Sequence, residues 1–303
     1  MFCLAAERFD APLLLEGPNV LGLFNRRGRQ LFLHESGRAA QDSVFIEHNG
    51  LLLTPGAASS TIAEGLAAVL GALPAGGRLV VSGVDTAHLA AARQVGAVRL
   101  RAVRPAPFVD LSAPAPAGGY LAMVSANTRQ MLRRSFRRLG EPILRRAADP
   151  DEALDFLTAL MELHQAHWQR RGQPGAFADP WVRRFHQTLV MRAMPRGEVD
   201  LLELARGGRV LGYLYNFRYR GQVLAYQAGF DNVAADTVRK PGLTAHHLAI
   251  ERAAAEGMIA YDFLGGEARY KRSLSTAETM LHWFDLAPRR SLCAVLWRIA
   301  GQG

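Results

Sequence analysis

Hydrophobic and polar residues alternate in short runs through the first third of the chain, and two longer runs have helical spacing. Runs bounded by Gly, Pro and Asn predict strands, and apolar residues three and four apart predict helices. The predicted strands are Leu13–Glu16, Val20–Asn25, Gln30–His34, Ser43–Glu47, Leu51–Thr54, Arg78–Ser82 and Ala97–Val103, and the predicted helices are Thr61–Leu73 and Thr86–Val95. The dipeptide Asn49-Gly50 predicts a hairpin turn.

A proline-rich segment, residues 104–119, has the composition of a linker. Beyond it, longer helical runs alternate with strand runs. The predicted helices are Tyr120–Leu139, Pro150–Arg170, Asp179–Ala193, Leu243–Glu256 and Ser291–Ala300, and the predicted strands are Pro142–Arg146, Val199–Ala205, Val210–Tyr219, Gln222–Gly229, Met258–Leu264 and Thr279–Leu286. The first half has a shorter version of this order. We therefore expect an α+β fold of two related units, residues 1–110 and 111–303.

Composition adds few constraints to this picture. A chain of 303 residues with 49% hydrophobic and 21% charged residues suits about two globular domains. No apolar run reaches the roughly 18 residues that span a bilayer, and the N-terminal sequence does not resemble a signal peptide. Cys3 and Cys293 form neither a metal-binding pattern nor a disulfide framework. We expect a cytoplasmic protein with no metal and no membrane span.

The net charge of +9 is concentrated in the second half of the chain. Residues 1–110 contain 10 arginines and 9 acidic residues, whereas residues 111–303 contain 26 Lys+Arg and 18 acidic residues. In the helix after the linker, Arg129, Arg133 and Arg137 form a row at i, i+4 spacing. The row either faces water or binds an anion such as a coenzyme phosphate, a glycan, a nucleic acid or an acidic peptide.

The segment from Asp236 to Leu274 carries the clearest chemical signal. A turn precedes a helix, and the free N–H groups and positive dipole end of such a helix attract a phosphate. Pro241 fixes the turn, and Gly242 lets the backbone approach a ligand closely. The residues of this predicted phosphate-binding turn are Arg239, Lys240, Pro241, Gly242, Leu243 and Thr244.

The strand after this helix brings a polar cluster to its carboxyl end. The cluster comprises Asp262, Gly265, Gly266, Glu267, Tyr270 and Lys271. Lys240 and Lys271 are the only lysines in the sequence, and both lie in this segment. Because a lysine is a compact, titratable point charge that arginine does not replace, this pairing favours a functional role. A turn that binds phosphate, followed by a polar cluster, is typical of an enzyme that uses a phosphorylated group donor.

Four segments resemble the GNAT-like acyltransferases found beside cellulose and exopolysaccharide biosynthesis genes, which are similar to the tandem-GNAT Fem aminoacyltransferases. Tyr120–Arg134 resembles the family's Y-L-x-x-L-S-x-x-x-R-x-x-L-R-R helix, and Val210–Asp231 resembles its central strands. Pro241-Gly242-Leu243 resembles the P-G turn of the donor loop, and Ala260–Leu274 resembles Y-D-F-x-x-G-x-x-x-Y-K. The resemblance implies tandem GNAT-like units, each a mixed, mostly antiparallel sheet flanked by helices.

GNAT enzymes bind the coenzyme A pyrophosphate with the pattern [Q/R]-x-x-G-x-[G/A]. Arg239 and Gly242 match the first two fixed positions, and Thr244 departs from the third. The threonine either crowds the loop or adds a hydroxyl toward the phosphate. The resemblance implies acyl-CoA as co-substrate, bound by the second unit, while the first unit is degenerate and shapes the acceptor cleft.

The activity that the resemblance implies is transfer of an acyl group to the amine of a peptide, an amino sugar or a small molecule. Backbone N–H groups near Gln227 and Gly229 are the expected oxyanion donors. Either Glu267 or Asp262 takes the proton of the nucleophile, and Asp262 has a second interpretation as a structural carboxylate that caps the next loop. We expect Tyr270 to protonate the leaving thiolate and Lys271 to stabilise negative charge or bind a phosphate.

Two other functions stay open. One is a Fem-type transferase that uses aminoacyl-tRNA, which the basic second half and Lys271 favour. The other is a non-catalytic GNAT-fold binding protein. His246 with Glu251 resembles an acyltransferase H-x-x-x-x-E pair, but i and i+5 share no helix face, so we interpret His246 as an ordinary helical residue. His164 and His167 lack an evident third ligand and predict no metal.

Overall fold

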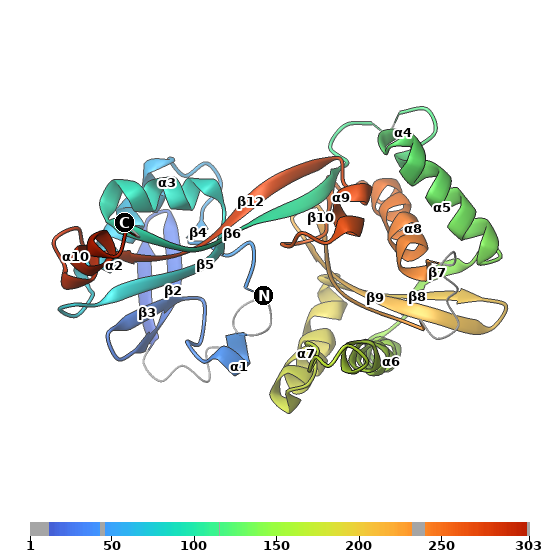
Figure 1. Ribbon diagram of the computed structural model, residues 1–303, viewed down its shortest axis with the longest axis horizontal. Coiled ribbons are helices and arrows are strands. Elements are labelled where there is room, and N and C mark those ends of the chain that lie inside the picture. The colour runs from blue at the N-terminus through green and yellow to red at the C-terminus, as the bar shows by residue number, and fades with distance from the viewer. Residues whose placement is uncertain (1–11, 43–45, 115, 232–239, 302–303) are drawn as a thin grey trace. The chain divides into compact units, whose positions relative to one another are not determined.

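The computed structural model describes residues 12–42, 46–114, 116–231 and 240–301 (Figure 1). The chain forms two compact units, one of Met1–Pro105 with Thr279–Gly303 and the other of Ala106–Glu278. Two strands, β6 (Ala97–Asp110) and β12 (Ala277–Ala287), cross the boundary between the units. The expected boundary at residue 110 lies close to the first crossing. The expected second unit ran to residue 303, whereas here the last 25 residues belong to the first compact unit because β12 pairs with β5.

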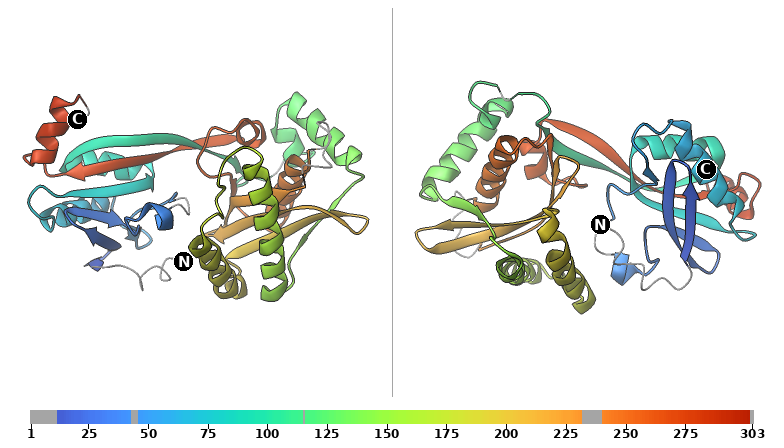
Figure 2. Two further views of the ribbon diagram at one scale, coloured as in Figure 1. Left: turned by 60° about the horizontal axis from the view of Figure 1, so that its bottom comes forward. Right: turned by 180° about the vertical axis from the view of Figure 1, so that it is seen from behind.

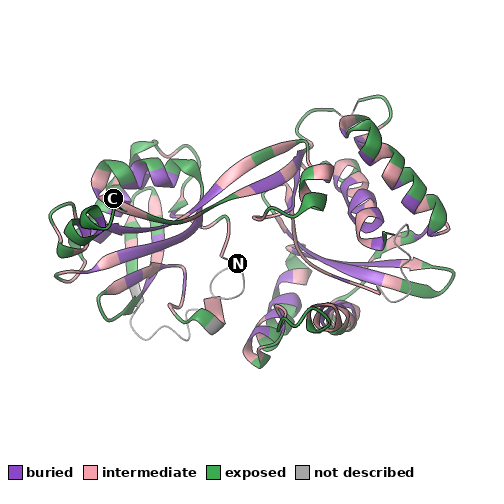
Figure 3. Ribbon diagram, viewed as in Figure 1, coloured by how far each residue is buried: buried purple, intermediate pink, exposed green. Residues whose placement is uncertain are grey.

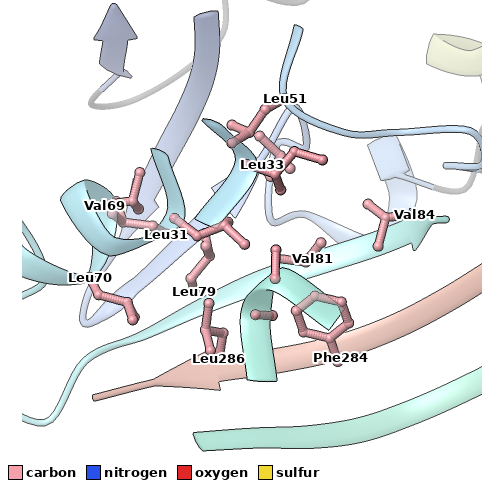
Figure 4. Close-up of a cluster of buried hydrophobic side chains, with 14 of the residues drawn as sticks. Leu31, Leu33, Leu51, Val69, Leu70, Leu79, Val81, Val84, Phe284 and Leu286 are labelled. Carbon is pink, nitrogen blue, oxygen red and sulfur yellow. The ribbon is translucent and has the colours of Figure 1, made fainter. Parts of the chain in front are cut away.

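The first unit has the strand order β1-β2-β3-β5-β12-β6, with β4 beside β2. Its helices α2 and α3 contribute buried residues to one apolar core with the strands (Figure 4), and Phe24, Leu33, Leu79 and Phe284 in that core are fully buried. The elements are β1 (Pro12–Gly17), β2 (Val20–Arg27), β3 (Gln30–Leu33), α1 (Ala39–Asp42), β4 (Leu52–Leu53), α2 (Ser60–Gly71), β5 (Arg78–Val84), α3 (Thr86–Val95) and α10 (Leu292–Ile299).

The second unit has the strand order β6-β11-β10-β9-β8-β7, and all neighbours except β10 and β11 are antiparallel. Helices α5 and α8 cover one face of the sheet, and α6 and α7 cover the other (Figures 1 and 2). The elements are α4 (Tyr120–Met123), α5 (Ala126–Arg138), β7 (Ile143–Arg146), α6 (Pro150–Gln169), α7 (Pro180–Ala193), the 3₁₀ turn η2 (Met194–Arg196), β8 (Val199–Arg206), β9 (Arg209–Tyr219), β10 (Gln222–Phe230), α8 (Pro241–Ala255), β11 (Ala260–Asp262) and α9 (Arg269–Leu274).

Side-chain caps explain where several helices begin. The carboxylates of Asp85, Asp149 and Asp179 accept backbone N–H groups at the starts of α3, α6 and α7. Ser125 does the same for α5, where its hydroxyl accepts from Thr128 N–H at 3.2 Å. The single predicted helix Tyr120–Leu139 is therefore wrong in one respect: Ser125 is an N-cap, and the chain forms α4 and α5 on either side of it.

Three other local predictions are corrected. The predicted linker is strand β6 as far as Asp110, because residues 108–110 pair with β11 despite the two prolines. No helix was predicted between β11 and β12, but the segment with the polar cluster contains the helix α9. The predicted hairpin at Asn49 is absent from the described residues: Asn49 bridges to Val84 in parallel and its amide donates to Leu33 O. Residues 43–45 of the predicted strand there lie outside the described ranges.

The architecture confirms the predicted α+β class, a mixed and mostly antiparallel sheet with flanking helices. Over the described residues, no helix is both long and apolar enough to span a bilayer.

Candidate active site

The strands β10 and β11 are parallel neighbours, but they pair over only three residues. Gln222–Leu224 of β10 pairs with Ala260–Asp262, whereas β10 stays paired with β9 as far as Phe230. On the β11 side, residues 225–230 have no partner strand in the described part of the chain. Because the two strands run in the same direction, this free edge lies at their carboxyl ends, which is where parallel sheets bind ligands.

The backbone of Ala228 faces this free edge. Its carbonyl oxygen lies 3.2 Å from His164 Nδ1, and the N–H of Asp231 donates to a β9 carbonyl at 3.1 Å. Successive residues of an antiparallel strand alternate between facing the partner and facing away. By this alternation the backbone groups of Gln227 and Gly229 face β9, and the N–H of Ala228 points to the free edge.

A β-bulge marks the same stretch of β10. The register shifts between Ala225 and Gln227, which places Tyr226 at the bulge. Bulges of this kind redirect backbone groups and are frequent beside active sites. Gly229 has a packing role here, because a Cβ at this position would lie 2.5 Å from Leu160 O of α6.

Helix α8 begins at the same end of the sheet. Pro241 is its first residue and has no N–H, and the N–H groups of Gly242 and Leu243 have no hydrogen-bond acceptor among the described residues. A Cβ on Gly242 would lie 3.2 Å from the ring of Phe230, so the first turn of the helix packs against the end of β10. The free N–H groups and the helix dipole make this turn a site for an anion. Arg239, predicted to belong to this turn, lies outside the described residues.

Helix α5 holds this turn in place through one buried serine. Ser135 Oγ accepts a hydrogen bond from Lys240 N–H at 3.2 Å and lies 2.9 Å from Thr244 Oγ1. Thr244 is fully buried, so its hydroxyl is directed to Ser135. The two roles that the sequence suggested for Thr244, crowding the loop or binding a phosphate, are replaced by a structural one. The side chain of Lys240 is exposed.

The carboxyl end of β11 forms a tight loop that Lys271 closes. Asp262 is buried, and its Oδ1 accepts the N–H of Leu264 at 2.6 Å. Leu264 has a φ of 62°, a conformation that costs energy for a residue with a Cβ. Lys271 Nζ donates to Gly265 O at 2.8 Å and to Leu264 O at 3.3 Å. The ammonium group thus stabilises the strained loop from the first turns of α9.

Tyr270 and His246 connect α9 to α8. Their rings stack with centroids 5.6 Å apart and planes 19° apart. Nδ1 of His246 lies 2.9 Å from the hydroxyl of the buried Tyr261. Burial lowers the pKa of His246 to about 3, with a smaller contribution from the charge of Lys271, so the imidazole is neutral at pH 7. Desolvation raises the pKa of Tyr270 to about 12 although the residue is 40% exposed, and its hydroxyl is protonated at neutral pH.

The structure therefore brings Asp262, Tyr270 and Lys271 to one end of β11, and it leaves Glu267 exposed in the loop before α9. His246, interpreted from the sequence as an ordinary helical residue, belongs to this cluster because α9 folds back onto α8. No spacing signal in the sequence reveals the contact. The H-x-x-x-x-E pattern contains His246, but the side chain that stacks on His246 is Tyr270 and not Glu251.

A second buried histidine lies beneath the bulge on the opposite face of the sheet. His186 of α7 places Nε2 3.0 Å from Tyr226 Oη and Nδ1 3.3 Å from Tyr215 Oη. Burial lowers its pKa to about 3. His186 supports Tyr226 at the bulge from below, a role that sequence analysis missed because the two residues are 40 positions apart.

His164, one of the two histidines that were weighed as metal ligands, has other partners. His164 Nδ1 faces Ala228 O, and Nε2 faces the N–H of Ala176 at 3.2 Å. Both ring nitrogens are thus used in holding α6 to β10 and to the following loop. Over the described ranges, no group of three or more His, Cys, Asp or Glu residues has a geometry that suits a metal ion.

The exposed face of α5 carries the arginine row beside the α8 turn. Arg133, Arg134, Arg137 and Arg138 are exposed, and none forms an ion pair within the described part of the chain. Arg129 is partly buried, and its Nε has no hydrogen-bond partner there. The contact of Ser135 with Lys240 places this basic face next to the first turn of α8.

Residues 126–272, from α5 to α9, match the model of a protein family described as Acetyltransferase (GNAT) domain. The matched segment contains the strands β10 and β11, the α8 turn and the polar cluster. No curated protein matches the sequence.

Solved structures with similar folds cover nearly the whole chain. FemX has a TM-score of 0.61 and 12% identity, over 96% of this chain and 91% of that chain. A conserved protein of unknown function from Bacteroides thetaiotaomicron has a TM-score of 0.62 and 11% identity, over 94% and 88%. L-PGS from Bacillus licheniformis has a TM-score of 0.58 and 13% identity, over 96% and 88%. At these identities the similarity shows the fold. The family match assigns the GNAT domain to residues 126–272 of this fold.

Proposed function

We propose that the protein is an N-acyltransferase that transfers an acyl group from acyl-CoA to the amine of a peptide, an amino sugar or a small molecule. One observation carries the proposal: β10 and β11 separate at the end of the sheet where α8 begins. An extended thioester fits along the free edge of β10 while its phosphates approach the N–H groups of Gly242 and Leu243. The matched GNAT domain covers this geometry and supports a transferase.

The proposed reaction is attack of the amine nitrogen on the thioester carbonyl. A C–N bond forms, the C–S bond breaks, and the proton lost by the amine is recovered by the departing thiolate. The N–H of Ala228 faces the free edge, and we assign to it the role of oxyanion donor that was predicted for backbone N–H groups near Gln227 and Gly229. Holding both reactants along one strand edge supplies a large part of the rate.

The polar cluster after β11 supplies the proton transfers in this proposal. Tyr270 is protonated at neutral pH and is the candidate acid for the thiolate. Glu267 is exposed and free to reach an acceptor amine, directly or through water, whereas Asp262 already accepts the N–H of Leu264. We therefore favour Glu267 as the base and assign Asp262 to the loop. Lys271 fixes that loop and adds a positive charge beside it.

A second candidate donor is aminoacyl-tRNA. The observation that favours it is the exposed arginine face of α5, which extends the anion site at α8 along the helix. The affinity of a polynucleotide increases with each phosphate that a cation of the protein neutralises, so a row of several arginines favours it. Coenzyme A carries fewer phosphates and needs fewer cations. The more specific resemblance to the transferases associated with cellulose biosynthesis stays a prediction, as does a non-catalytic binding role.

A pair of assays separates these functions. Release of free thiol from acetyl- and longer acyl-CoAs, in the presence of a panel of amines, tests the first proposal. Filter binding of aminoacyl-tRNA, with transfer of a radiolabelled aminoacyl group, tests the second. The double variant Arg133→Glu, Arg137→Glu is expected to weaken tRNA binding strongly, and the effect is larger at low salt. The matched control is the double variant Arg184→Glu, Arg192→Glu, which reverses two charges on α7 instead.

Thiol release without tRNA binding supports the acyl-CoA proposal. Binding of tRNA that depends on Arg133 and Arg137, without thiol release, replaces it by the second candidate. Binding of acyl-CoA with no turnover for any amine favours the non-catalytic role.

A further inference from the structure

Helix α10, in the first unit, presents an apolar stripe to solvent. Leu292, Val295, Leu296 and Ile299 are 63%, 39%, 54% and 78% exposed, and they occur at i, i+3, i+4 and i+7 on one helix face. Figure 3 shows exposed positions along α10. The opposite face is anchored, because Trp297 is buried. Four large apolar side chains on a helix of eight residues stay in contact with water unless another surface covers them. Covering them would gain the free energy of removing apolar surface from water.

The surroundings of this stripe are strongly basic. Residues 286–303 contain Arg289, Arg290 and Arg298 and no acidic residue. Arg289 caps the end of α3 by donating to Arg93 O at 2.6 Å, and Arg298 Nε lies 3.3 Å from Ala294 O. None of these three arginines, nor Arg93, forms an ion pair within the described ranges.

A cavity of about 950 Å³ opens between the start of β6 and α10. Five arginines line it, together with apolar and glycine residues and no acidic side chain: Arg93, Arg99, Arg101, Arg289 and Arg298. Arg99 and Arg101 are paired with the buried Asp285, which fixes them in place beneath the cavity. The remaining three bring uncompensated charge to its wall.

From these observations we propose that the first unit binds the surface of an anionic phospholipid bilayer, with the α10 stripe among the acyl chains and lipid phosphates at the arginine cavity. An amphipathic helix with apolar residues on one face and arginines beside it binds membranes in this orientation. The arginines are complementary to anionic headgroups, and guanidinium groups pair well with phosphate oxygens. The proposal concerns the first unit and does not depend on the transferase function.

Charge argues against a second copy of this chain as the occupant. In a symmetric dimer the same patch lies on both sides of the interface, so the arginines around α10 would meet their own copies. Like charges at close range cost binding energy. A bilayer of anionic lipids supplies the opposite charge and the apolar phase together.

The test is co-sedimentation of the full chain with vesicles of phosphatidylcholine alone or mixed with phosphatidylglycerol. We expect binding only to the mixed vesicles, and a loss of binding as salt is raised. Leu296→Glu and Ile299→Glu each weaken binding at least tenfold, and Arg298→Gln weakens it roughly fivefold. One matched control is Ile143→Glu, because Ile143 of the second unit is an apolar residue that is 72% exposed. The other control is Arg192→Gln of α7. We expect both control variants to bind the mixed vesicles as the unaltered chain does.

Circular dichroism and the melting temperature establish that each variant is folded. Light scattering gives the oligomeric state with and without Ile299→Glu. The proposal is overturned if the folded chain does not bind the mixed vesicles, if it binds neutral vesicles equally well, or if the α10 variants bind no worse than the controls. A dimer that Ile299→Glu dissociates, without vesicle binding, would assign the stripe to a second copy instead.

Discussion

Ser135 of α5 and Thr244 of α8 lie 109 residues apart in the sequence and share a buried hydrogen bond of 2.9 Å. Ser135 also accepts the N–H of Lys240, so one hydroxyl of α5 fixes the first turn of the helix that is proposed to bind the donor phosphates. The position of the anion site is thus set by a neighbouring helix, and this relationship can be tested.

Ser135→Ala leaves the hydroxyl of Thr244 buried without its partner, and we expect a loss of about 1–3 kcal/mol in the free energy of unfolding. Thr244→Val alone produces a similar loss. The double variant is expected to be less destabilised than the sum of the two, because neither polar group remains unpaired. Urea unfolding of the four proteins measures this coupling, and strict additivity would show that the two hydroxyls do not interact.

Gly242→Val puts a branched side chain against Phe230, because a Cβ at this position would lie 3.2 Å from the ring. We expect acyl-CoA affinity to fall at least tenfold, because the side chain occupies the approach to the free N–H groups. Calorimetry with a non-hydrolysable acyl-CoA measures the change. Gly71→Val at the end of α2 is the control, since nothing lies within 4 Å of its Cβ. Equal affinity of the two variants would move the donor site away from α8.

Lys271→Met removes the ammonium group that bonds to Leu264 O and Gly265 O. Loss of one fixed electrostatic contact at a reacting centre costs about 10²–10³ in rate, and we expect a loss of this size with the fold retained. Lys271→Arg does not restore activity, because the planar guanidinium is larger and does not match the two carbonyls. The control is Arg272→Met at the next position, which removes the hydrogen bond from the Arg272 guanidinium to the backbone oxygen of Glu267. Near-normal turnover of Lys271→Met would make the lysine incidental, and unfolding would make it structural.

The buried histidines make stability depend on pH. The pKa of His186 and of His246 is about 3 in the folded protein and near 6.5 in the unfolded chain, so as pH falls below 6.5 the unfolded state takes up protons first. The contribution of these histidines to the free energy of unfolding therefore decreases from pH 6.5 toward 3, by up to about 1.4 kcal/mol per pH unit for each histidine. Urea titrations at several pH values measure this slope. His246→Gln reduces it. A resonance of His246 that titrates near pH 6.5 in the folded protein would contradict the prediction.

The α+β class, the order of the central elements and the α8 turn were predictable from the sequence. Each depends on local information: the period of apolar residues, the Gly turns of the meander, and the Pro-Gly dipeptide at the start of a helix. The matched GNAT domain covers the segment that carries most of the predicted site. The cluster at the end of β11 was also predicted, because its residues are close in sequence.

Tertiary structure decided the features that require contacts between distant segments. The proline-rich residues 104–110 read as a linker but form an inner strand, because pairing with β11 outweighs the local preference of proline. Which backbone groups of β10 face the free edge depends on the bulge at Tyr226, and a shift of one residue reverses every assignment. His246 belongs to the site because α9 packs against α8 and brings Tyr270 onto the imidazole ring. Sequence periodicity specifies which face of an element is buried, but the partner that buries it is chosen by the folded chain as a whole.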